Sequence, residues 1–380
     1  MPGGSRREAL PLKKLAFPLL FFALFALPLP SSAQAAQSAA PVRLLTVDLA
    51  LQWLPQSQFA GYYMAVQKGF YREAGLYVRL RHADGQNSSL SLLDKGEVQM
   101  ATSFLTDAII AAEPDADART SATLSFSWSK TAGQDARAAS RRVKPDIVQL
   151  AQIVRRSNLL LVGWRELGIQ TAADLSGKKV SYWLGSFSAA YETFFRESGV
   201  TPISIPQFYS VNLFLRKGVA ACAAMEYNEY NRILQAGVEP DSLTVFSLRD
   251  QGFGFPEDGL YARADWFESH RDAALAIRDA TMKGWRYANE HRDEVLDYVL
   301  AEARRAGIST NRAHEKWMLE HILASIFIDS DDAVSTSLPA DEYTKVTTAL
   351  VQTAMLSSVP AWELFAPFSA GAGDVTGDKR

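Results

Sequence analysis

"LLTVDLALQWLPQSQFAGYYMAVQKGF", residues 44–70, decides the fold of this chain. Its first ten residues are rich in β-branched and leucine side chains and predict a strand. Apolar residues then recur at helical spacing until Lys68 and Gly69, which predicts a helix that ends there. The aromatic residues gathered between the two elements are candidates either for the core or for a binding site.

The same succession of elements returns later in the chain. "REAGL" at 72–76 is echoed by "RESGV" at 196–200, and "LLDKGEVQMA" at 92–101 by "FLRKGVAACAA" at 214–224. Strand-like and helix-like runs alternate in both units, which predicts parallel sheets. We therefore expect two similar βαβαβ lobes, whose strands direct their carboxyl ends into one crevice where a ligand binds.

The first 35 residues predict a secretory signal peptide. Basic side chains precede the apolar run 15–30, and cleavage after Ala35 fits the small residues there. A membrane anchor is the alternative, but the run is short, contains prolines and lacks stop-transfer charges. The lone cysteine, Cys222, excludes both a lipid anchor at the cleavage site and an internal disulfide. We expect a periplasmic protein without a stable membrane anchor, held together by its core.

Composition narrows the class of protein further. Apolar residues make up 48% of the 380 residues and charged ones 21%, with a formal net charge of −3. These values are typical of a soluble globular protein and give no basic excess for nucleic acid. Residues 114–146, rich in Ala, Ser, Asp and Arg, predict a surface insertion.

Four stretches carry a resemblance to a known family. They are "LQWLPQSQFAGYYMAVQKGFYREAGL" (51–76), "DLSGKKVSYWLGSF" (174–187), "KGVAACAAMEYNEYNRIL" (217–234) and "MKGWRYANEHRDEVLDYVL" (282–300). In this order they resemble the NMT1/THI5-like (SsuA/THI5-like) family, which includes the thiamine-pyrimidine and riboflavin binders of ABC transporters. The resemblance covers roughly residues 44 to 350. It implies the α/β type II periplasmic binding protein fold, with two lobes around a cleft and a two-segment hinge.

The resemblance also implies the domain boundaries. Lobe I would contain residues 41–160 and 248–365, and lobe II residues 161–247. Residues 366–380 would form a flexible tail.

In the pyrimidine-binding members, aromatic residues after the first strand form a face for a flat heterocycle. The matching positions here are Trp53, Phe59 and Tyr62, although helical spacing of aromatic residues is equally compatible with a core. A carboxylate after a strand of lobe II bonds ring amino groups in those members, which indicates Glu226, with Asn228 and Glu229 beside it. Both carboxylates are also compatible with an ordinary helix start.

Hydroxyl and carboxyl side chains precede two further predicted helices. Ser103 and Asp107 lie in "SFLTDA", and Ser186 in "LGSFSAA". They are candidates for binding an anionic or carbonyl group together with free backbone N–H groups, or for capping the helices.

The predicted function is that of a monomeric solute receptor of an ABC importer. It would deliver a planar heterocycle, such as a thiamine pyrimidine precursor or a riboflavin-like compound, to a permease and its ATPase. An aliphatic sulfonate or nitrate-type anion is the alternative ligand, and a role beside a membrane sensor kinase stays open.

An enzyme is disfavoured, although the same fold family includes a thiamine pyrimidine synthase. Ser103 and Asp107 stand where that enzyme has its lysine and histidine, and "QGFGF" (251–255) where it has its cysteine cluster. We therefore expect no catalytic residue, cofactor or metal. His314 and His321 share a helix face without the further ligands of a metal site.

Overall fold

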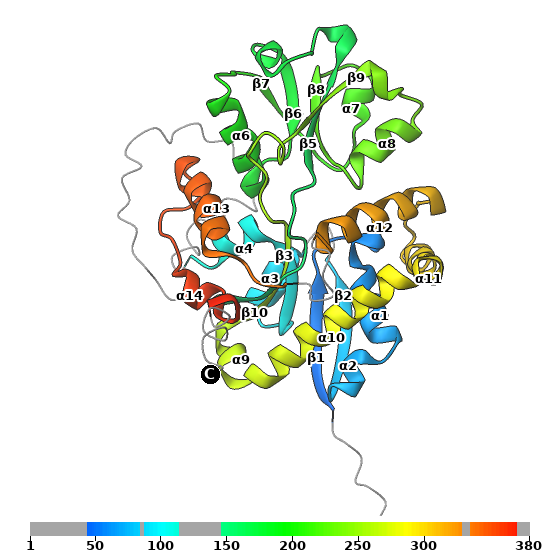
Figure 1. Ribbon diagram of the computed structural model, residues 1–380, viewed down its shortest axis with the longest axis vertical. Helices are drawn as coiled ribbons and strands as arrows, with labels where there is room; N and C mark the ends of the chain where they lie inside the picture. The colour runs from blue at the N-terminus through cyan, green and yellow to red at the C-terminus, as the bar shows by residue number, and fades with distance from the viewer. Residues whose placement is uncertain (1–43, 84–86, 114–145, 329–334, 371–380) are drawn as a thin grey trace, which may run out of the picture. The chain divides into compact units, whose positions relative to one another are not determined.

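The computed structural model describes residues 44–83, 87–113, 146–328 and 335–370 (Figure 1). The predicted signal peptide with its cleavage site lies outside the described residues, as does the predicted insertion except for Asp146. Two five-stranded sheets with helices packed around them organise the described chain.

The first sheet has the strand order β2-β1-β3-β10-β4. Its strands are β1 (Leu45–Leu51), β2 (Leu76–His82), β3 (Met100–Phe104), β4 (Ile147–Gln152) and β10 (Asp258–Arg263). β1 pairs in parallel with β2 and β3, whereas β10 runs antiparallel to both β3 and β4. β1, β3 and β4 are strongly apolar and largely buried, as expected for strands covered on both faces.

The second sheet repeats this topology with the order β7-β6-β8-β5-β9. Its strands are β5 (Leu159–Trp164), β6 (Lys179–Tyr182), β7 (Ile203–Pro206), β8 (Ala221–Met225) and β9 (Leu243–Ser247). β6 is parallel to β7 and β8, and β5 is antiparallel to β8 and β9.

The predicted repeat is therefore confirmed, but the prediction of parallel sheets is wrong in one respect. Both sheets are mixed, because the chain returns to each of them from the other one. It crosses from β4 to β5 and back from β9 to β10, and these two crossings are the predicted two-segment hinge. We call the first sheet with its helices lobe I and the second sheet with its helices lobe II; the exact domain boundaries stay a prediction.

Helices cover the sheets and connect their strands. Those of lobe I are η1 (Ser57–Phe59), α1 (Ala60–Gln67), α2 (Phe70–Glu73), α3 (Ser89–Asp94), α4 (Leu105–Ala111), α9 (Ala264–Ser269), α10 (Arg271–Glu290), α11 (Arg292–Arg305), α12 (Arg312–Ile326), α13 (Ala340–Gln352), α14 (Trp362–Phe365) and α15 (Pro367–Ala370). Lobe II has η2 (Arg165–Leu167), η3 (Ala172–Leu175), η4 (Gly185–Phe187), α6 (Ser188–Glu197), α7 (Asn212–Leu215), α8 (Glu229–Gln235) and η5 (Pro240–Ser242). None of the helices in the described ranges is long and apolar enough to cross a bilayer.

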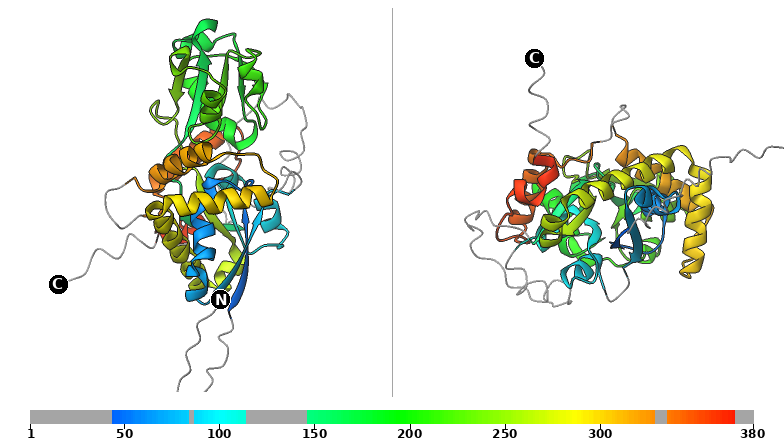
Figure 2. Two further views of the ribbon diagram at one scale, coloured as in Figure 1. Left: turned by 90° about the vertical axis from the view of Figure 1, so that its right-hand side faces the viewer. Right: turned by 90° about the horizontal axis from the view of Figure 1, so that it is seen from below.

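The contact between α1 and α10 holds the opening stretch of the sequence in place. α10 and α11 lie against α1 on the same side of the first sheet (Figure 2). At the crossing, Gly61 faces the Trp285 ring, and a Cβ on Gly284 would lie 2.0 Å from the Gly61 carbonyl oxygen. Two glycines thus allow the helix backbones to approach closely, and Tyr62 packs edge to face on Trp285.

The predicted flexible tail begins too early. Residues 367–370 form α15, which contacts β4, and Phe368 packs against the core. The Ser369 hydroxyl accepts a hydrogen bond from the Leu338 backbone N–H at 2.8 Å. Apolar contact and this bond order the segment, which a composition rich in small residues did not indicate.

Candidate functional site

The loops at the carboxyl ends of the parallel strands of both lobes come together. Trp53 follows β1, and Phe104 ends β3; in lobe II, Phe187 follows β6 and Tyr209 follows β7. A small cavity of about 20 Å³, enough for about one water molecule, lies between the lobes, and its lining comes from β3, α4, β5, η4, α6 and the returning hinge segment. It is lined by Phe104, Thr106, Leu159, Ser186, Phe187, Ala190, Phe255, Pro256 and Glu257. The cavity lies in the crevice at the carboxyl ends of the parallel strands, the position where open α/β sheets generally bind ligands.

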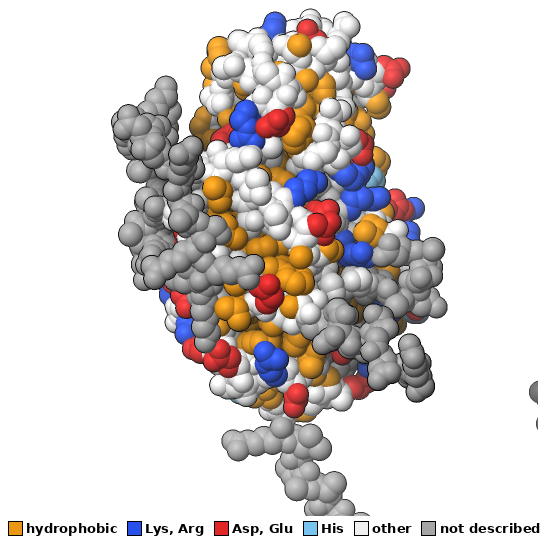
Figure 3. All heavy atoms as spheres, turned by 60° about the vertical axis from the view of Figure 1, so that its left-hand side comes forward, with side chains coloured by type: hydrophobic (Ala, Val, Ile, Leu, Met, Phe, Trp, Pro, Cys, Tyr) orange, Lys and Arg blue, Asp and Glu red, His pale blue; other side chains and the backbone are white. Residues whose placement is uncertain are grey.

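Aromatic rings from the two lobes meet at this crevice. The rings of Trp53 and Tyr209 have centroids 5.2 Å apart and are tilted by 36°. Phe104 and Phe187 pack edge to face at 4.3 Å, and Trp183 lies 5.9 Å from Phe187. Trp53 is 38% exposed and Tyr209 72% exposed, so both retain surface that a flat ligand could cover. On the face shown in Figure 3, hydrophobic side chains are interspersed with both acidic and basic ones.

Asp107 and Ser186 bind each other across the lobes. Asp107 lies in the first turn of α4, and its carboxylate accepts a hydrogen bond from the Ser186 hydroxyl, which lies in η4. Burial raises the pKa of Asp107 above its ordinary value, and the bond from Ser186 opposes this shift. Two residues singled out separately in the sequence thus form one contact beside the pocket.

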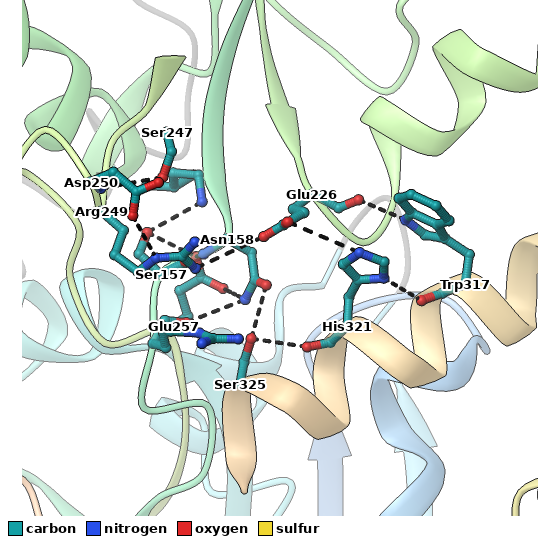
Figure 4. A network of polar contacts seen from close by, with 12 residues as sticks. Ser157, Asn158, Glu226, Ser247, Arg249, Asp250, Glu257, Trp317, His321 and Ser325 are labelled. Carbon is teal, nitrogen blue, oxygen red and sulfur yellow. Dashed lines mark hydrogen bonds and ion pairs between the residues drawn. The ribbon is translucent and has the colours of Figure 1, made fainter. Parts of the chain in front are cut away.

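Glu257 places a buried carboxyl group at the pocket wall. It accepts hydrogen bonds from the Asn158 backbone N–H at 2.5 Å, from Asn158 Nδ2 at 2.9 Å and from the Ser157 hydroxyl at 3.2 Å (Figure 4). These donors lie on the outgoing hinge segment, and Glu257 lies on the returning one, so the carboxyl group ties the two crossings together. Burial outweighs the three bonds and raises the pKa of Glu257 to about 8.

Asp258, next in the chain, is a second buried carboxyl group. It begins β10 and accepts a hydrogen bond from Gln58 Nε2 at 2.7 Å. Burial raises the pKa of Asp258 to about 7. The amide of Gln58 thereby links the loop after β1, which carries Trp53, to the hinge.

These two carboxyl groups predict that the protein loses stability as the pH rises from about 6.5 to 8. Glu257 and Asp258 keep protons in the folded state that the unfolded chain has already released, so unfolding releases protons in this window. The free energy of unfolding then falls with pH, by at most about 1.4 kcal/mol per pH unit for each group. Urea unfolding at several pH values should show a smaller slope for Glu257→Gln than for the wild type.

A slope unchanged by Glu257→Gln would contradict the assignment. The prediction is limited to pH values above about 6.5, because at lower pH His314 changes the free energy of unfolding in the opposite direction. Burial lowers the pKa of His314 to about 4, so its contribution to stability is lost as the pH falls through the ordinary histidine value.

Glu226 lies where the sequence places it, directly after β8, but its carboxylate is partly engaged. It is about one-third exposed and lies 3.9 Å from the Arg249 guanidinium and 4.0 Å from His321 Nε2 (Figure 4). Its backbone carbonyl accepts a hydrogen bond from Trp317 Nε1 at 2.8 Å. The carboxylate therefore combines access to solvent with fixed neighbours on the hinge and on α12.

The aromatic face expected from Trp53, Phe59 and Tyr62 is reduced to Trp53. Phe59 is fully buried beside His82, and Tyr62 is buried under α10 against Trp285. Their rings belong to the core of lobe I and present no face to a ligand. The helical spacing thus reflects packing, which corrects the expectation for these two residues.

Asn228, Glu229 and Ser103 also have structural surroundings. Glu229 accepts hydrogen bonds from the Met225 backbone N–H at 2.9 Å and from Asn228 Nδ2 at 2.8 Å, so both side chains hold the turn after β8. Ser103 lies inside β3 and is buried, and the residue that caps α4 is Phe104. The surroundings of these three residues are those of fold-stabilising side chains and give no reason to place them in a ligand site.

The sequence analysis missed several residues that line the crevice. They are Phe104, Trp183, Phe187, Phe208, Tyr209 and Glu257. Trp183 and Tyr209 follow strands β6 and β7 as Trp53 follows β1, so the rule that selected Trp53 would have selected them too. No local sequence pattern marks Glu257 in this way. It reaches the pocket wall only because the returning hinge segment passes there.

Two basic side chains lie at the hinge. Arg249 donates to the Ser157 carbonyl at 3.1 Å, and Nε of Arg156 is buried without a hydrogen-bond partner among the described residues. Within the same residues, no three His, Cys, Asp or Glu side chains are grouped to hold a metal ion.

The mixed sheets, the double crossing and the crevice between them define the periplasmic binding protein fold. The chain belongs to the NMT1/THI5-like family, whose profile matches residues 56–125 and 131–295. No curated protein sequence matches the chain.

Solved structures with the same fold share little sequence with it. The alkanesulfonate-binding protein SsuA of Xanthomonas axonopodis pv. citri, bound to MOPS, is 15% identical, with a TM-score of 0.55 over 87% of this chain and 98% of that one. The aliphatic sulphonate binding protein SsuA of Escherichia coli is 12% identical, with a TM-score of 0.57 over 84% and 91%. The nitrate-binding protein NrtA of Synechocystis PCC 6803 is 15% identical, with a TM-score of 0.52 over 88% and 90%. At such identities the likeness concerns the fold alone.

Proposed function

We propose that this protein is an exported solute receptor of an ABC importer that binds a planar, neutral or cationic heterocycle between its lobes. A thiamine pyrimidine precursor is the ligand class that fits best, and a riboflavin-like compound is the next. The binding role is not catalytic, and the partners are a permease and its ATPase.

The meeting of Trp53 with Tyr209 carries this proposal. Each ring comes from a different lobe, and each is partly exposed at the crevice. A flat ligand that stacks on the exposed surface of these rings gains about 0.5–1.5 kcal/mol beyond the burial of its area. The two rings lie 5.2 Å apart, so they would have to separate before a ligand could enter between them.

The polar groups beside the rings favour ligands that donate hydrogen bonds. Asp107 and Glu226 bring carboxyl groups to the crevice or its edge, and an exocyclic amine supplies the donors that a carboxylate accepts. Glu257 is not one of these acceptors, because it keeps its proton near pH 7 and is already bonded to Asn158 and Ser157. A carboxylate that loses such a partner in a closed cleft is left desolvated, so these groups reject ligands without donors.

An anionic ligand is the second candidate, and one observation favours it. The buried Nε of Arg156 has no partner among the described residues, and a sulfonate or nitrate oxygen would accept its hydrogen bond. The neighbouring structures named above bind anions of these kinds, which agrees with this alternative. The carboxyl groups of the crevice oppose it.

Tryptophan fluorescence titration distinguishes the two. We expect 4-amino-5-hydroxymethyl-2-methylpyrimidine or riboflavin to quench the emission saturably, with Kd below about 10 µM, and ethanesulfonate or nitrate to have no effect up to about 1 mM. Asp107→Asn and Glu226→Gln should each weaken binding by about tenfold or more. Saturable binding of ethanesulfonate or nitrate alone, lost in Arg156→Gln, would replace the heterocycle proposal by the anion.

A further inference from the structure

Helix α12 contacts each of the three parts that form the crevice. It packs on η1 and α11 of lobe I, and it reaches α8 of lobe II. Its side chains also bond the hinge. A single helix is therefore in a position to couple the arrangement of the lobes to the shape of the site.

The contact with lobe II involves two aromatic side chains. Trp317 Nε1 donates to the Glu226 carbonyl at 2.8 Å, and the two ring nitrogens of His314 lie 3.1 Å from Asn228 Oδ1 and 2.8 Å from Asn231 Oδ1. These bonds hold the loop after β8, which carries Glu226.

The protonation of His314 follows from its neighbours. Arg232 donates to Asn228 Oδ1 at 3.0 Å, which fixes that amide, so Nε2–H of His314 donates to the same oxygen. The ring is buried and neutral near pH 7, since burial and Arg232 lower its pKa to about 4. Nδ1 of the neutral ring then carries no proton and lies 2.8 Å from Asn231 Oδ1, so this contact is a hydrogen bond only when the Asn231 amide is turned to present its NH2 group to the ring. The contact is one of neutral, buried groups that lose their bonds if the loop moves away.

The contact with lobe I is made by the residue next to His314. Glu315 is buried and accepts hydrogen bonds from the backbone N–H and the hydroxyl of Ser57, each at 2.8 Å, and from the Thr310 hydroxyl at 2.7 Å. Ser57 begins η1, at the end of the loop after β1 and four residues beyond Trp53. The helix thereby holds the loop that carries the exposed tryptophan.

The contact with the hinge lies two to three turns further along the helix. The Ser325 hydroxyl lies 2.9 Å from both Asn158 Oδ1 and the His321 carbonyl oxygen, and its one proton is shared between them (Figure 4). The Ser325 carbonyl accepts a hydrogen bond from the Arg155 backbone N–H at 3.0 Å. Asn158 is also the residue that bonds Glu257. Residues 314, 317, 321 and 325 recur every three or four positions, so they lie along one side of the helix.

His321 completes this side of the helix. Its ring stacks on Trp317 with centroids 4.2 Å apart, and its Nε2 faces the Glu226 carboxylate at 4.0 Å. Nδ1 lies 2.8 Å from the Trp317 carbonyl oxygen, which orients the ring. The backbone and the side chain of Glu226 are thus both in contact with α12.

We propose that α12 is a latch that holds the lobes together and positions the Glu226 loop. Separation of the second sheet from the first exchanges the bonds of Trp317 and His314 for bonds to water, so opening is opposed by the net free energy of each bond. The latch itself does not depend on the identity of the ligand; only its effect on recognition, through Glu226, rests on the proposed function.

Distances between spin labels on the two lobes test the latch without any ligand. Ile203→Cys on β7 and Tyr77→Cys on β2 provide exposed labelling sites, and native Cys222 is buried and stays unlabelled. Trp317→Phe retains a ring against His321 but removes the N–H donor. We expect the distance distribution of this variant, measured by double electron–electron resonance, to gain a separate population that the parent double-cysteine protein lacks or holds several-fold less often.

The matched control is Trp266→Phe. Trp266 stacks on His270 in the same way, with ring centroids 4.7 Å apart, but it lies on α9 of lobe I. It should leave the distribution unchanged. An unchanged distribution in Trp317→Phe as well would overturn the latch, and so would equal shifts in the two variants.

A second readout follows the loop itself. Hydrogen exchange of the backbone N–H groups in 226–231 should accelerate by about tenfold or more in Trp317→Phe and in Ser325→Ala, while exchange in β1 stays as in the parent. A uniform acceleration over the whole chain would mean a general loss of stability and would contradict a latch. Because neither readout uses a ligand, a failure of the latch is distinguishable from a failure of the proposed function.

Discussion

Replacing Trp53 by alanine should weaken ligand binding by at least about 30-fold while the unliganded protein stays folded. A tryptophan that closes on a ligand from one lobe, opposite Tyr209 on the other, has the features of residues whose truncation costs about 2 kcal/mol or more. The ring is 38% exposed without ligand, so its removal takes little from the core. Calorimetric titration with the thiamine pyrimidine, together with thermal unfolding of the unliganded protein, measures both effects.

Tyr77→Ala is the control for this prediction. Tyr77 is a similarly exposed ring, 47% accessible, but it lies near the start of β2, at the amino end of the parallel strands. It should leave the affinity within about twofold of the wild type. If Trp53→Ala instead lowers the melting temperature of the unliganded protein by more than about 5 °C, Trp53 is a core residue and the aromatic site is wrong.

Replacing Gly284 by valine should cause the largest loss of stability that we predict in lobe I. A Cβ at this position would lie 2.0 Å from the Gly61 carbonyl oxygen and 2.8 Å from the Ala65 nitrogen. Both are backbone atoms of α1, so relief requires the two helices to separate over their most extensive contact. We expect a loss of at least about 3 kcal/mol in the free energy of unfolding, measured by urea denaturation.

The neighbouring residue supplies the control. Lys283 is exposed on the same helix, and Lys283→Ala should change the free energy of unfolding by less than about 0.5 kcal/mol. A Gly284→Val protein as stable as the wild type would show that α1 and α10 are not closely packed there. In that case the packing of α1 against α10 would not be what holds the loop that carries Trp53 in place.

Much of the fold could be predicted, because local patterns coincide with the elements that form. The strand predicted in 44–53 is β1, and each of the paired motifs at 72–76 and 196–200 contains a glycine with positive φ, Gly75 and Gly199. The direction of β10 could not be predicted in this way. An apolar run of strand length does not reveal whether the chain enters a sheet from its own lobe or from the other one.

The candidate site could be predicted only in part, for a related reason. Trp53, Asp107, Ser186 and Glu226 lie at the crevice or its edge, because the carboxyl ends of parallel strands share one edge of each sheet. Phe59 and Tyr62 have the same helical spacing that a ligand face would have. Their burial is decided by α10 and its Trp285, which are distant in the sequence.

The most direct test of a heterocycle receptor is the mass of the ligand that the protein carries. Native mass spectrometry of the protein from a periplasmic extract, followed by release of the bound molecule, provides it. We predict the mass of a pyrimidine or a flavin, absent from protein carrying Trp53→Ala. A released alkanesulfonate or nitrate, retained by that variant, would contradict the account and indicate that the anion site at Arg156 is the true one.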